Sequence, residues 1–438
     1  MKGIVAVLWL AVKRGLSLNV GGATEGGIHF NAGPENSVTN DVSDDADLKG
    51  WIAPESMATI DREAADRQMA RSESLEVIDE LVNSQRYAAY PMEISAICIR
   101  FGLNAQSCAR VEAYLGRLAH NRTKQTVKLR GFFSGTITAK ANVFAIGVRS
   151  MCEAPADSAC DIYRRDFCKV VTAASGRALL GDKAALFKFG DTRDAHACYP
   201  TFYKTRLMKL RDDNYVLLDL NHDRHWGMVG QVPGADVSWS QKRTQLVWRG
   251  ASTGRCDAYF NNTRMMLVRK YFHSQDPRID VGFSEALQHC DAARSYVKPG
   301  MSMQTVLAAK YVLVAQGNDK ASGLNWALAS NSVPFMVEPD IESWLLESSL
   351  KAWEHYIPIE PDFSDLGSQV EWAVQNDGEA ERIAKAGKDY MQQFKNRKTE
   401  TDIEAAVLTA YLDRMDVRTS KLSGVVDGHL EKTCLETP

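Results

Sequence analysis

The chain has 438 residues, which predicts two or three domains at roughly 150 residues per domain. Hydrophobic residues make up 45% of the chain and charged residues 24%, and both values exclude wholesale disorder. The formal net charge of −3 argues against a strongly basic nucleic-acid-binding protein. The composition therefore indicates a globular protein of enzyme size that does not bind nucleic acid.

The N-terminal region, residues 1–60, differs in composition from the rest of the chain. It is rich in Gly, Asn, Ser and Asp after residue 15, which predicts a flexible arm. The apolar segment Ile4–Val12 is too short to cross a membrane core, which needs about 20 residues. This segment is either a short targeting segment or a buried N-terminal segment. No other stretch approaches membrane-spanning length, so the protein is not expected to be integral, and peripheral association stays open.

The cysteines leave the cellular compartment open. Cys152, Cys160, Cys168 and Cys198 lie close together in the sequence, as cysteines that form disulfides in a secretory lumen can do. That lumen would fit a eukaryotic protein, whereas a cytoplasmic or membrane-peripheral location would fit a bacterial one. No C-x-x-C pair occurs and no histidine lies at zinc-finger spacing, so no structural metal is expected.

Predicted helices and strands alternate along most of the chain. Helical periodicity begins near Ile60, runs to Val82, and returns between Cys108 and Leu118. Strand-length apolar runs follow at Ala184–Phe189, Tyr215–Leu220, Gln245–Trp248, Tyr311–Ala315 and Val333–Val337. Further helical patterns cover Ala258–Tyr271, Gly323–Ala329, Ser364–Val374, Ala380–Phe394 and Glu400–Met415. Strands that alternate with helices predict an α/β fold with parallel sheets, here in two units.

The turn after the strand that ends at Trp248 is the most informative local feature. Its sequence, WRGASTG over residues 248–254, leads into a helical pattern that begins near Cys256. Backbone N–H groups at such a helix start favour an anion. Ser252 and Thr253 add hydroxyl groups, and Arg249 adds a guanidinium group suited to phosphate. An ordinary glycine-containing turn with a Ser or Thr cap is the competing interpretation.

The same turn also fits the G-x-S-x-G pattern of an α/β-hydrolase nucleophile elbow, from Gly250 to Gly254. In that hypothesis Ser252 is the nucleophile, with Asp340 and His355 following in the required order. No HGGG-like oxyanion segment precedes it, so a serine hydrolase is the alternative enzyme.

A second strand–loop–helix follows the strand that contains Tyr311–Ala315. Its loop, GNDKASG over residues 317–323, would lie at the carboxyl end of the strand, where open α/β sheets bind ligands. Lys320 in this loop could neutralise a phosphate, although an exposed lysine is more often only solvated. The two loops together could hold a diphosphate.

Two other segments hold charged or ring side chains. Residues 353–358 include His355, which in isolation is more often structural than catalytic. Lys204, Arg206, Arg224 and His225 flank the strand Tyr215–Leu220 and could face an acceptor or a phosphate, or form surface salt bridges.

Taken in order, several segments resemble glycosyltransferase family 90. This family contains lipopolysaccharide-modifying and capsule-associated transferases and protein O-glucosyltransferases. The resemblance covers about Phe187 to Phe394 and is nearer to the bacterial lipopolysaccharide-type branch. It is carried by FGD (189–191), KTR (204–206), LLDLNHDRH (217–225), WRGASTG (248–254), QGNDKASGLNWALASNSVPFM (316–336) and AWEHYIPIEPDFSDL (352–366).

The resemblance implies a GT-B fold, in which two Rossmann-like domains face a cleft. The implied organisation is an arm (1–60), an acceptor-side domain (61–240), a nucleotide-sugar-binding domain (245–395), and a crossover helix with a tail (396–438). Relatives use UDP-sugars such as UDP-glucose or UDP-xylose, invert the anomeric centre and need no metal. The acceptor would be a hydroxyl group of a glycan, a lipopolysaccharide or a protein.

The resemblance also assigns site residues. The donor-binding set is Arg249, Gly250, Ser252, Thr253, Gly317, Asn318, Asp319, Ser322, His355 and Tyr356, with Lys320 in place of a basic residue that relatives carry in the following helix. Candidates for the catalytic base are Asp191, Asp161 and Asp166. Without a base the chain would be a non-catalytic nucleotide-sugar- or glycan-binding protein, which is the alternative from another class.

Overall fold

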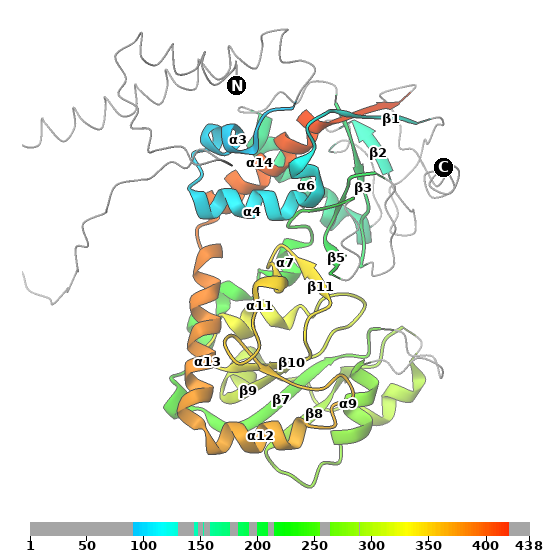
Figure 1. Cartoon of the computed structure of the whole chain (residues 1–438). Coiled ribbons are helices and arrows are strands. Elements are labelled where there is room, and N and C mark those ends of the chain that lie inside the picture. The colour runs from blue at the N-terminus through cyan, green and yellow to red at the C-terminus, as the bar shows by residue number, and fades with distance from the viewer. Residues whose placement is uncertain are drawn as a thin grey trace, which may run out of the picture. The chain divides into compact units, whose positions relative to one another are not determined.

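The computed structural model (Figure 1) describes residues 91–129, 144–147, 152, 158–175, 183–191, 199–208, 214–254, 263–288 and 290–419. All of these residues belong to one unit of the chain, residues 70–438. The predicted arm, the segment Ile4–Val12 and the helical pattern from Ile60 to Val82 lie outside the described residues. The same is true of Cys198 and of the predicted helix start near Cys256.

The first sheet is mixed and contains the earliest and the latest described strands. Its strands are β1 (Gln125–Leu129), β2 (Phe144–Gly147), β3 (Ala184–Phe187), β4 (Thr201–Tyr203), β6 (Tyr215–Leu217) and β13 (Met415–Thr419). The order is β1-β13-β3-β4-β6, and β2 pairs with β3. Pairs β1–β13, β3–β4 and β4–β6 are parallel, whereas β13–β3 and β2–β3 are antiparallel.

Four helices belong with the first sheet: α3 (Ile94–Phe101), α4 (Ala105–Leu115), α6 (Ser158–Ser175) and α14 (Arg397–Arg414). Helix α14 packs against the other three. Most of its residues are buried, including Glu400 and Glu404. The C-terminal helix therefore forms part of the core beside the first sheet.

The second sheet is entirely parallel. Its strands are β7 (Arg243–Ala251), β8 (Ile279–Glu285), β9 (Ala309–Val314), β10 (Val333–Met336) and β12 (Ile357–Pro358), in the order β12-β10-β9-β7-β8. Every residue of β9 is buried, as expected for a parallel strand covered on both faces. The helices of this region are α9 (Thr263–Tyr271), α10 (Met303–Leu307), α11 (Gly323–Leu328), α12 (Leu366–Gln375) and α13 (Asp377–Tyr390).

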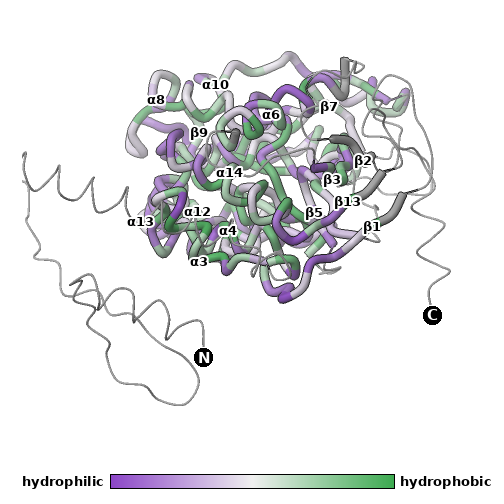
Figure 2. The backbone as a smooth tube through the Cα atoms, turned by 90° about the horizontal axis from the view of Figure 1, so that it is seen from above, coloured by the Kyte–Doolittle hydropathy of each residue, from purple (hydrophilic) through white to green (hydrophobic). Residues whose placement is uncertain are grey.

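Helix α13 shows why these sequences form covering helices. Its buried residues Ala380, Ile383, Ala384 and Gly387 recur at helical spacing, so one face is apolar and the other is charged. The tube in Figure 2 alternates accordingly between hydrophobic and hydrophilic residues along the outer helices.

Short elements connect the two sheets. Strand β5 (Thr205–Leu207) pairs antiparallel with β11 (Ile341–Ser343) in a separate two-stranded ribbon. The short helices are α7 (His222–His225), α8 (Val232–Ala235), η2 (Gly116–His120), η3 (Val229–Gln231), η4 (Trp239–Gln241), η5 (Asp291–Tyr296), η6 (Glu347–Ser349) and η7 (Met391–Phe394). The ribbon joins residues that follow β4 to residues that follow β10.

The predicted α/β fold with parallel sheets is confirmed. The five predicted strands correspond to β3, β6, β7, β9 and β10, and the C-terminal helical pattern corresponds to α14. One element differs from the prediction. After α14, residues 415–419 form β13, whereas the sequence analysis assigned this segment to a tail. The sequence MDVRT has no apolar run, and its strand conformation depends on pairing with β1.

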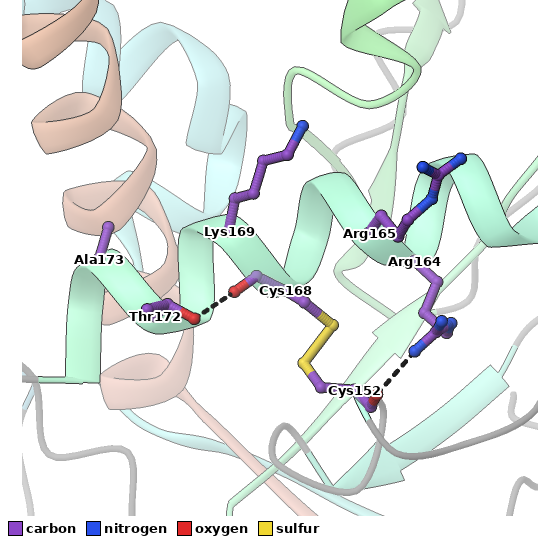
Figure 3. Close-up of a pocket in the computed structure, with 7 residues that line it drawn as sticks. All are labelled: Cys152, Arg164, Arg165, Cys168, Lys169, Thr172 and Ala173. Atoms are coloured by element: carbon purple, nitrogen blue, oxygen red, sulfur yellow. Dashed lines mark hydrogen bonds between the residues drawn. A yellow bond between two sulfur atoms is a disulfide. The ribbon is translucent and has the colours of Figure 1, made fainter.

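Two disulfides lie within the described residues. Cys98 bonds to Cys108 in the α3–α4 region, and Cys152 bonds to Cys168 of α6. Figure 3 shows the second disulfide, beside which Arg164 donates a hydrogen bond to the carbonyl oxygen of Cys152 at 2.6 Å. None of the helices in the described part of the chain has the length and apolar character needed to span a membrane.

Candidate active site

The loops that follow β7 and β9 meet directly. The backbone N–H of Gly254 donates a hydrogen bond to the Asn318 side-chain oxygen at 2.9 Å. Gly317 packs so closely on the first loop that an added Cβ would lie 2.7 Å from the Thr253 hydroxyl oxygen. Because β7 and β9 are parallel neighbours, their carboxyl ends lie at the same edge of the sheet. The two loops singled out in the sequence therefore form one structure.

A cavity of about 280 Å³ lies at this edge. Residues 248–251 at the end of β7 and Thr253 in the loop after it line the cavity on one side, and residues 321–323 line it from the second loop. Trp326 adds an indole ring, and Arg224 from α7 adds a cation. Its volume is close to the lower end of the roughly 300–1,000 Å³ usual for small-molecule sites.

Arg264, which the sequence analysis did not identify, joins the two loops. From the first turn of α9 its guanidinium group donates to the Ala251 carbonyl oxygen at 2.8 Å and to the Thr253 hydroxyl at 2.7 Å. It also donates to the Ala315 carbonyl oxygen at 2.9 Å. Burial, together with the nearby charge of Arg224, lowers the pKa of Arg264 to about 10, so it remains a cation at neutral pH. Arg264 lines the cavity and provides positive charge there.

The guanidinium group of Arg249, assigned to the donor diphosphate by resemblance, is bound by the protein. It donates to both carboxylate oxygens of Asp280 on the neighbouring strand β8, at 3.0 and 2.9 Å. Burial alone would raise the pKa of Asp280, but Arg249 and Lys298 lower it below its usual value. Arg249 lines the cavity, and its charge is shared with Asp280.

Ser252 is buried and engaged with the backbone. Its hydroxyl donates to the Leu287 carbonyl oxygen at 3.0 Å and accepts from the Leu287 N–H at 2.7 Å. His355 accepts a hydrogen bond from the Lys351 N–H through Nδ1, and its Nε2 lies 3.7 Å from the Glu354 carboxylate. The structure thus does not bring Ser252 and His355 together, so it does not assemble the catalytic triad of the hydrolase hypothesis.

Lys320 also has a complete set of protein partners. Its ammonium group lies 2.9 Å from the Glu347 carboxylate and donates to the Ser343 hydroxyl at 2.7 Å and to the Asn325 side-chain oxygen at 3.0 Å. These three contacts use the three donors of an ammonium group. The side chain therefore does not reach the cavity, whereas Ser322 of the same loop lines it.

His355 and Tyr356 lie away from the cavity, beside α13. An added Cβ on Gly387 of α13 would lie 3.1 Å from the His355 carbonyl oxygen. Burial lowers the pKa of His355 and raises that of Tyr356 to about 12. The His355 ring lies 5.4 Å from the ring of Tyr390 at the end of α13, and the Tyr356 side chain is buried.

Asp191, one of the three candidate bases, lies in a cluster between the two sheets. It follows β3 and contacts the ammonium group of Lys204, which follows β4. The Tyr163 hydroxyl donates to Asp191 Oδ1 at 2.9 Å, and the Arg224 guanidinium lies 3.8 Å from its Oδ2. Burial alone would raise the pKa of Asp191, but Lys204 and these neighbours lower it. Asp191 is therefore ionised at neutral pH and is adjacent to Arg224 at the cavity wall.

The other two candidate bases lie on α6 and bind residues of their own helix. Asp161 pairs with Arg164 at 2.6 Å and with Arg165 at 3.0 Å. Asp166 pairs with Lys169 at 2.9 Å and also accepts a hydrogen bond from the backbone N–H of His222. Arg164, Arg165 and Lys169 line an open hollow beside the disulfide of Figure 3, and each already has a carboxylate partner. Neither carboxylate lines the cavity between the loops.

The remaining predicted cationic residues have different surroundings. Arg206 forms an ion pair with Glu342 across the β5–β11 ribbon. Arg224 is half exposed and lines the cavity. His225 is buried, and neither of its ring nitrogens has a hydrogen-bond partner among the described residues. Burial and nearby cations lower the pKa of His225 well below its usual value.

Comparisons with known proteins show which family part of this chain is similar to. Residues 225–434 match the family described as glycosyl transferase family 90. The O-glucosyltransferase LpsA of Dichelobacter nodosus is 33% identical over 217 residues, which cover 50% of this chain and 63% of LpsA. Protein O-glucosyltransferase 2 of Danio rerio is 28% identical over 202 residues, 46% of this chain and 36% of that protein.

The match to LpsA supports the bacterial lipopolysaccharide-type branch that the sequence indicated. The chain spans less than two thirds of the length of either relative. Both loops of the cavity lie inside the family match, whereas Asp191 and Lys204 precede it. The resemblance that the sequence indicated is confirmed: residues 225–434 match glycosyl transferase family 90.

Proposed function

We propose that this protein is an inverting, metal-independent glycosyltransferase of the GT-B type. It transfers a glucose- or xylose-type sugar from a UDP-sugar to a hydroxyl group of a glycan, a lipopolysaccharide or a protein. The observation that carries the proposal is the cavity shared by the β7 and β9 loops within the family 90 domain. The relatives named O-glucosyltransferases support glucose and a hydroxyl acceptor.

The donor would bind in this cavity. Arg224 and Arg264 would face the diphosphate, together with the Thr253 hydroxyl and the backbone of residues 250 and 251. The indole of Trp326 offers an apolar surface to the nucleoside or the sugar. As two cations line the site, the protein itself could stabilise the charge of the leaving diphosphate, and this supports transfer without a metal.

Asp191 is the proposed base. Its carboxylate would accept the proton of the acceptor hydroxyl while that oxygen attacks the anomeric carbon. The bond between the anomeric carbon and the diphosphate oxygen breaks in the same step, and UDP leaves. Attack from the face opposite the diphosphate inverts the anomeric centre. Asp191 follows a strand of the first sheet and the donor loops follow strands of the second, a division that supports a GT-B arrangement.

The test combines binding and turnover on the full chain. Thermal-shift screening against nucleotide sugars should select UDP-sugars, and turnover of the selected donor should persist in EDTA. Asp191→Asn should retain UDP affinity and lose about 10²–10⁴-fold in kcat. Asp161→Asn, which removes a carboxylate paired on α6, is the matched control.

The outcomes separate the alternatives. UDP binding without turnover with any acceptor would indicate a nucleotide-sugar-binding protein. Equal activity of wild type and Asp191→Asn would overturn the assignment of the base. Absence of UDP binding would overturn the proposed function as a whole.

A further inference from the structure

A single buried lysine contacts two carboxylates from different parts of the fold. The ammonium group of Lys204 contacts Asp191 Oδ1 and lies 2.5 Å from Asp319 Oδ2. Asp191 follows β3 of the first sheet, and Asp319 belongs to the loop that follows β9 of the second. The exposed fractions of the Lys204, Asp191 and Asp319 side chains are 3%, 17% and 5%.

The contacts of Lys204 leave it unsuited to bind a phosphate. Its ammonium group contacts two carboxylates, those of Asp191 and Asp319, and also lies 3.4 Å from the Tyr163 hydroxyl. Lys204 does not line the cavity, whereas Arg224 and Arg264 do. The acceptor or phosphate role considered from the sequence is therefore not the one its surroundings favour.

The charges of Lys204, Asp191 and Asp319 indicate the electrostatic role of this lysine. Two carboxylates held close together in a buried site cannot both stay ionised without a cation between them. Burial raises the pKa of Asp319, and Lys204 opposes this shift. Lys204 itself is held charged by the two carboxylates, which raise its pKa above the usual value despite burial.

Other groups of the described part of the chain also face Asp191. Tyr163 from α6 donates a hydrogen bond, Arg224 from α7 lies 3.8 Å away, and Asp319 approaches through Lys204. Burial raises the pKa of Tyr163, so this hydroxyl stays neutral and remains a donor. Arg224 is half exposed, so Lys204 is the buried cation that faces the carboxylate.

We propose that Lys204 is a positioning residue that keeps Asp191 ionised and fastens it, through Asp319, to the donor loop. One ammonium group then aligns the base with the cavity in which the donor binds. This inference rests on the proposed function, because it takes Asp191 as the base.

The test compares Lys204→Met, Lys204→Arg and the matched control Lys310→Met. Lys310 also pairs with a carboxylate, Asp377 at 2.5 Å, and lies over an aromatic ring, Trp239 at 4.9 Å, much as Lys204 lies 5.7 Å from the centre of the Tyr163 ring. It belongs to the first half of β9, away from the loop that follows this strand.

In Lys204→Met, the acidic limb of the pH profile of kcat/KM should move up by about 1–3 pH units, because Asp191 loses its cation. The Kd for UDP should stay unchanged. Lys204→Arg should keep the limb near the wild-type position, and Lys310→Met should not move it. An unmoved limb in Lys204→Met would overturn the inference, as would loss of UDP affinity with no change in the limb.

A second measurement does not depend on activity. In Lys204→Met, one of the buried carboxyl groups should have a raised folded-state pKa. The free energy of unfolding of this variant should therefore increase as pH falls from 7 to 5. Wild type should show a smaller increase, because Lys204 keeps Asp191 ionised and opposes the rise in the pKa of Asp319. Identical pH profiles of urea unfolding in the two proteins would overturn the inference even if the proposed function failed.

If Lys204→Met does not fold, Asp319→Asn tests the same inference. In this variant the acidic limb of the pH profile of kcat/KM should shift in the opposite direction. Removing the second carboxylate leaves Lys204 to Asp191 alone, so the acidic limb should move down. A limb that stays in place in this variant would show that the two carboxylates are not coupled and would overturn the inference.

Discussion

The end of β7 and the loop after β9 each contain a basic residue that the sequence assigned to the donor phosphate, and the structure pairs each with a carboxylate instead. Arg249 binds Asp280, whose side chain is 26% exposed, on the neighbouring strand. Lys320 binds Glu347 in a pair with exposed fractions of 4% and 2%. The first pair is near solvent and the second is inside the protein.

This difference shows what a strand–turn–helix pattern can indicate. The pattern places the loop backbone at the edge of the sheet, and both loops do line one cavity. It does not indicate which way a long side chain extends, because a nearby carboxylate from another element determines that. The burial of each ion pair then determines how much the free energy of unfolding should fall when the pair is removed.

The largest effect is expected for the deeper pair. Glu347→Gln leaves the buried ammonium group of Lys320 without a counter-charge, which should lower the free energy of unfolding by about 3–5 kcal/mol. Urea denaturation measures this change. Glu354→Gln is the control, because its pair with Lys351 is exposed and should contribute at most about 1 kcal/mol. A loss in Glu347→Gln no larger than in the control would show that Lys320 is not confined to the buried pair.

Arg224→Ala should affect binding more than stability. The half-exposed guanidinium group lines the cavity, and loss of a charged hydrogen bond to a diphosphate corresponds to about 1.5–3 kcal/mol, or roughly 10- to 100-fold in UDP affinity. Titration calorimetry with UDP measures the affinity. Arg382→Ala, on the exposed face of α13, is the control. Unchanged affinity in Arg224→Ala would indicate that this cation does not contact the donor.

Gly317→Ala should separate the two loops. The new Cβ would lie 2.7 Å from the Thr253 hydroxyl and 3.1 Å from the Arg264 guanidinium carbon, so either loop must move. We expect a stability loss of about 1–3 kcal/mol together with weaker UDP binding. Gly367→Ala is the control, because a Cβ there would meet no atom within 4 Å. Equal stability and equal UDP affinity in the two variants would show that the close contact between the loops is not needed for either property.

The smallest expected effect is on stability at acid pH and concerns the Arg249–Asp280 pair. The pKa of Asp280 is lowered in the folded protein, so its contribution to stability is present above the unfolded-state pKa of about 3.9 and is lost as pH falls below it. Because the pair is partly exposed, this contribution should be about 1 kcal/mol or less. Asp280→Asn should remove that part of the acid dependence of unfolding. An unchanged profile below pH 4 would mean that the pair contributes nothing.

The sequence predicted those parts of the fold that depend on local pattern. The run Tyr311–Ala315 was recognised as a strand because it is apolar, and in the structure every residue of β9 is buried. Strand β13 was not, because its residues take their conformation from a partner strand, β1, almost 300 residues earlier in the chain. The GT-B domain boundaries stay a prediction.

The site was predictable to a similar extent. Both loops were located, since Gly and small polar residues after an apolar strand are a local signal. Arg264 was missed because its role depends on hydrogen bonds from α9 to the carbonyl oxygens of Ala315 and Gln316. No spacing in the sequence indicates these contacts. Asp191 could not be separated from Asp161 and Asp166, because what distinguishes it is the proximity of Lys204 and Arg224.

The position of β13 bears on how the protein is made. This strand lies between β1 and β3, and the helix before it, α14, is largely buried against α3, α4 and α6. During synthesis, β1 and β3 emerge long before the strand that joins them, whereas all strands of the second sheet are complete by residue 358. The second sheet can consequently form while the chain is still being translated. The first sheet can be completed only after β13, which ends at residue 419, has been synthesised.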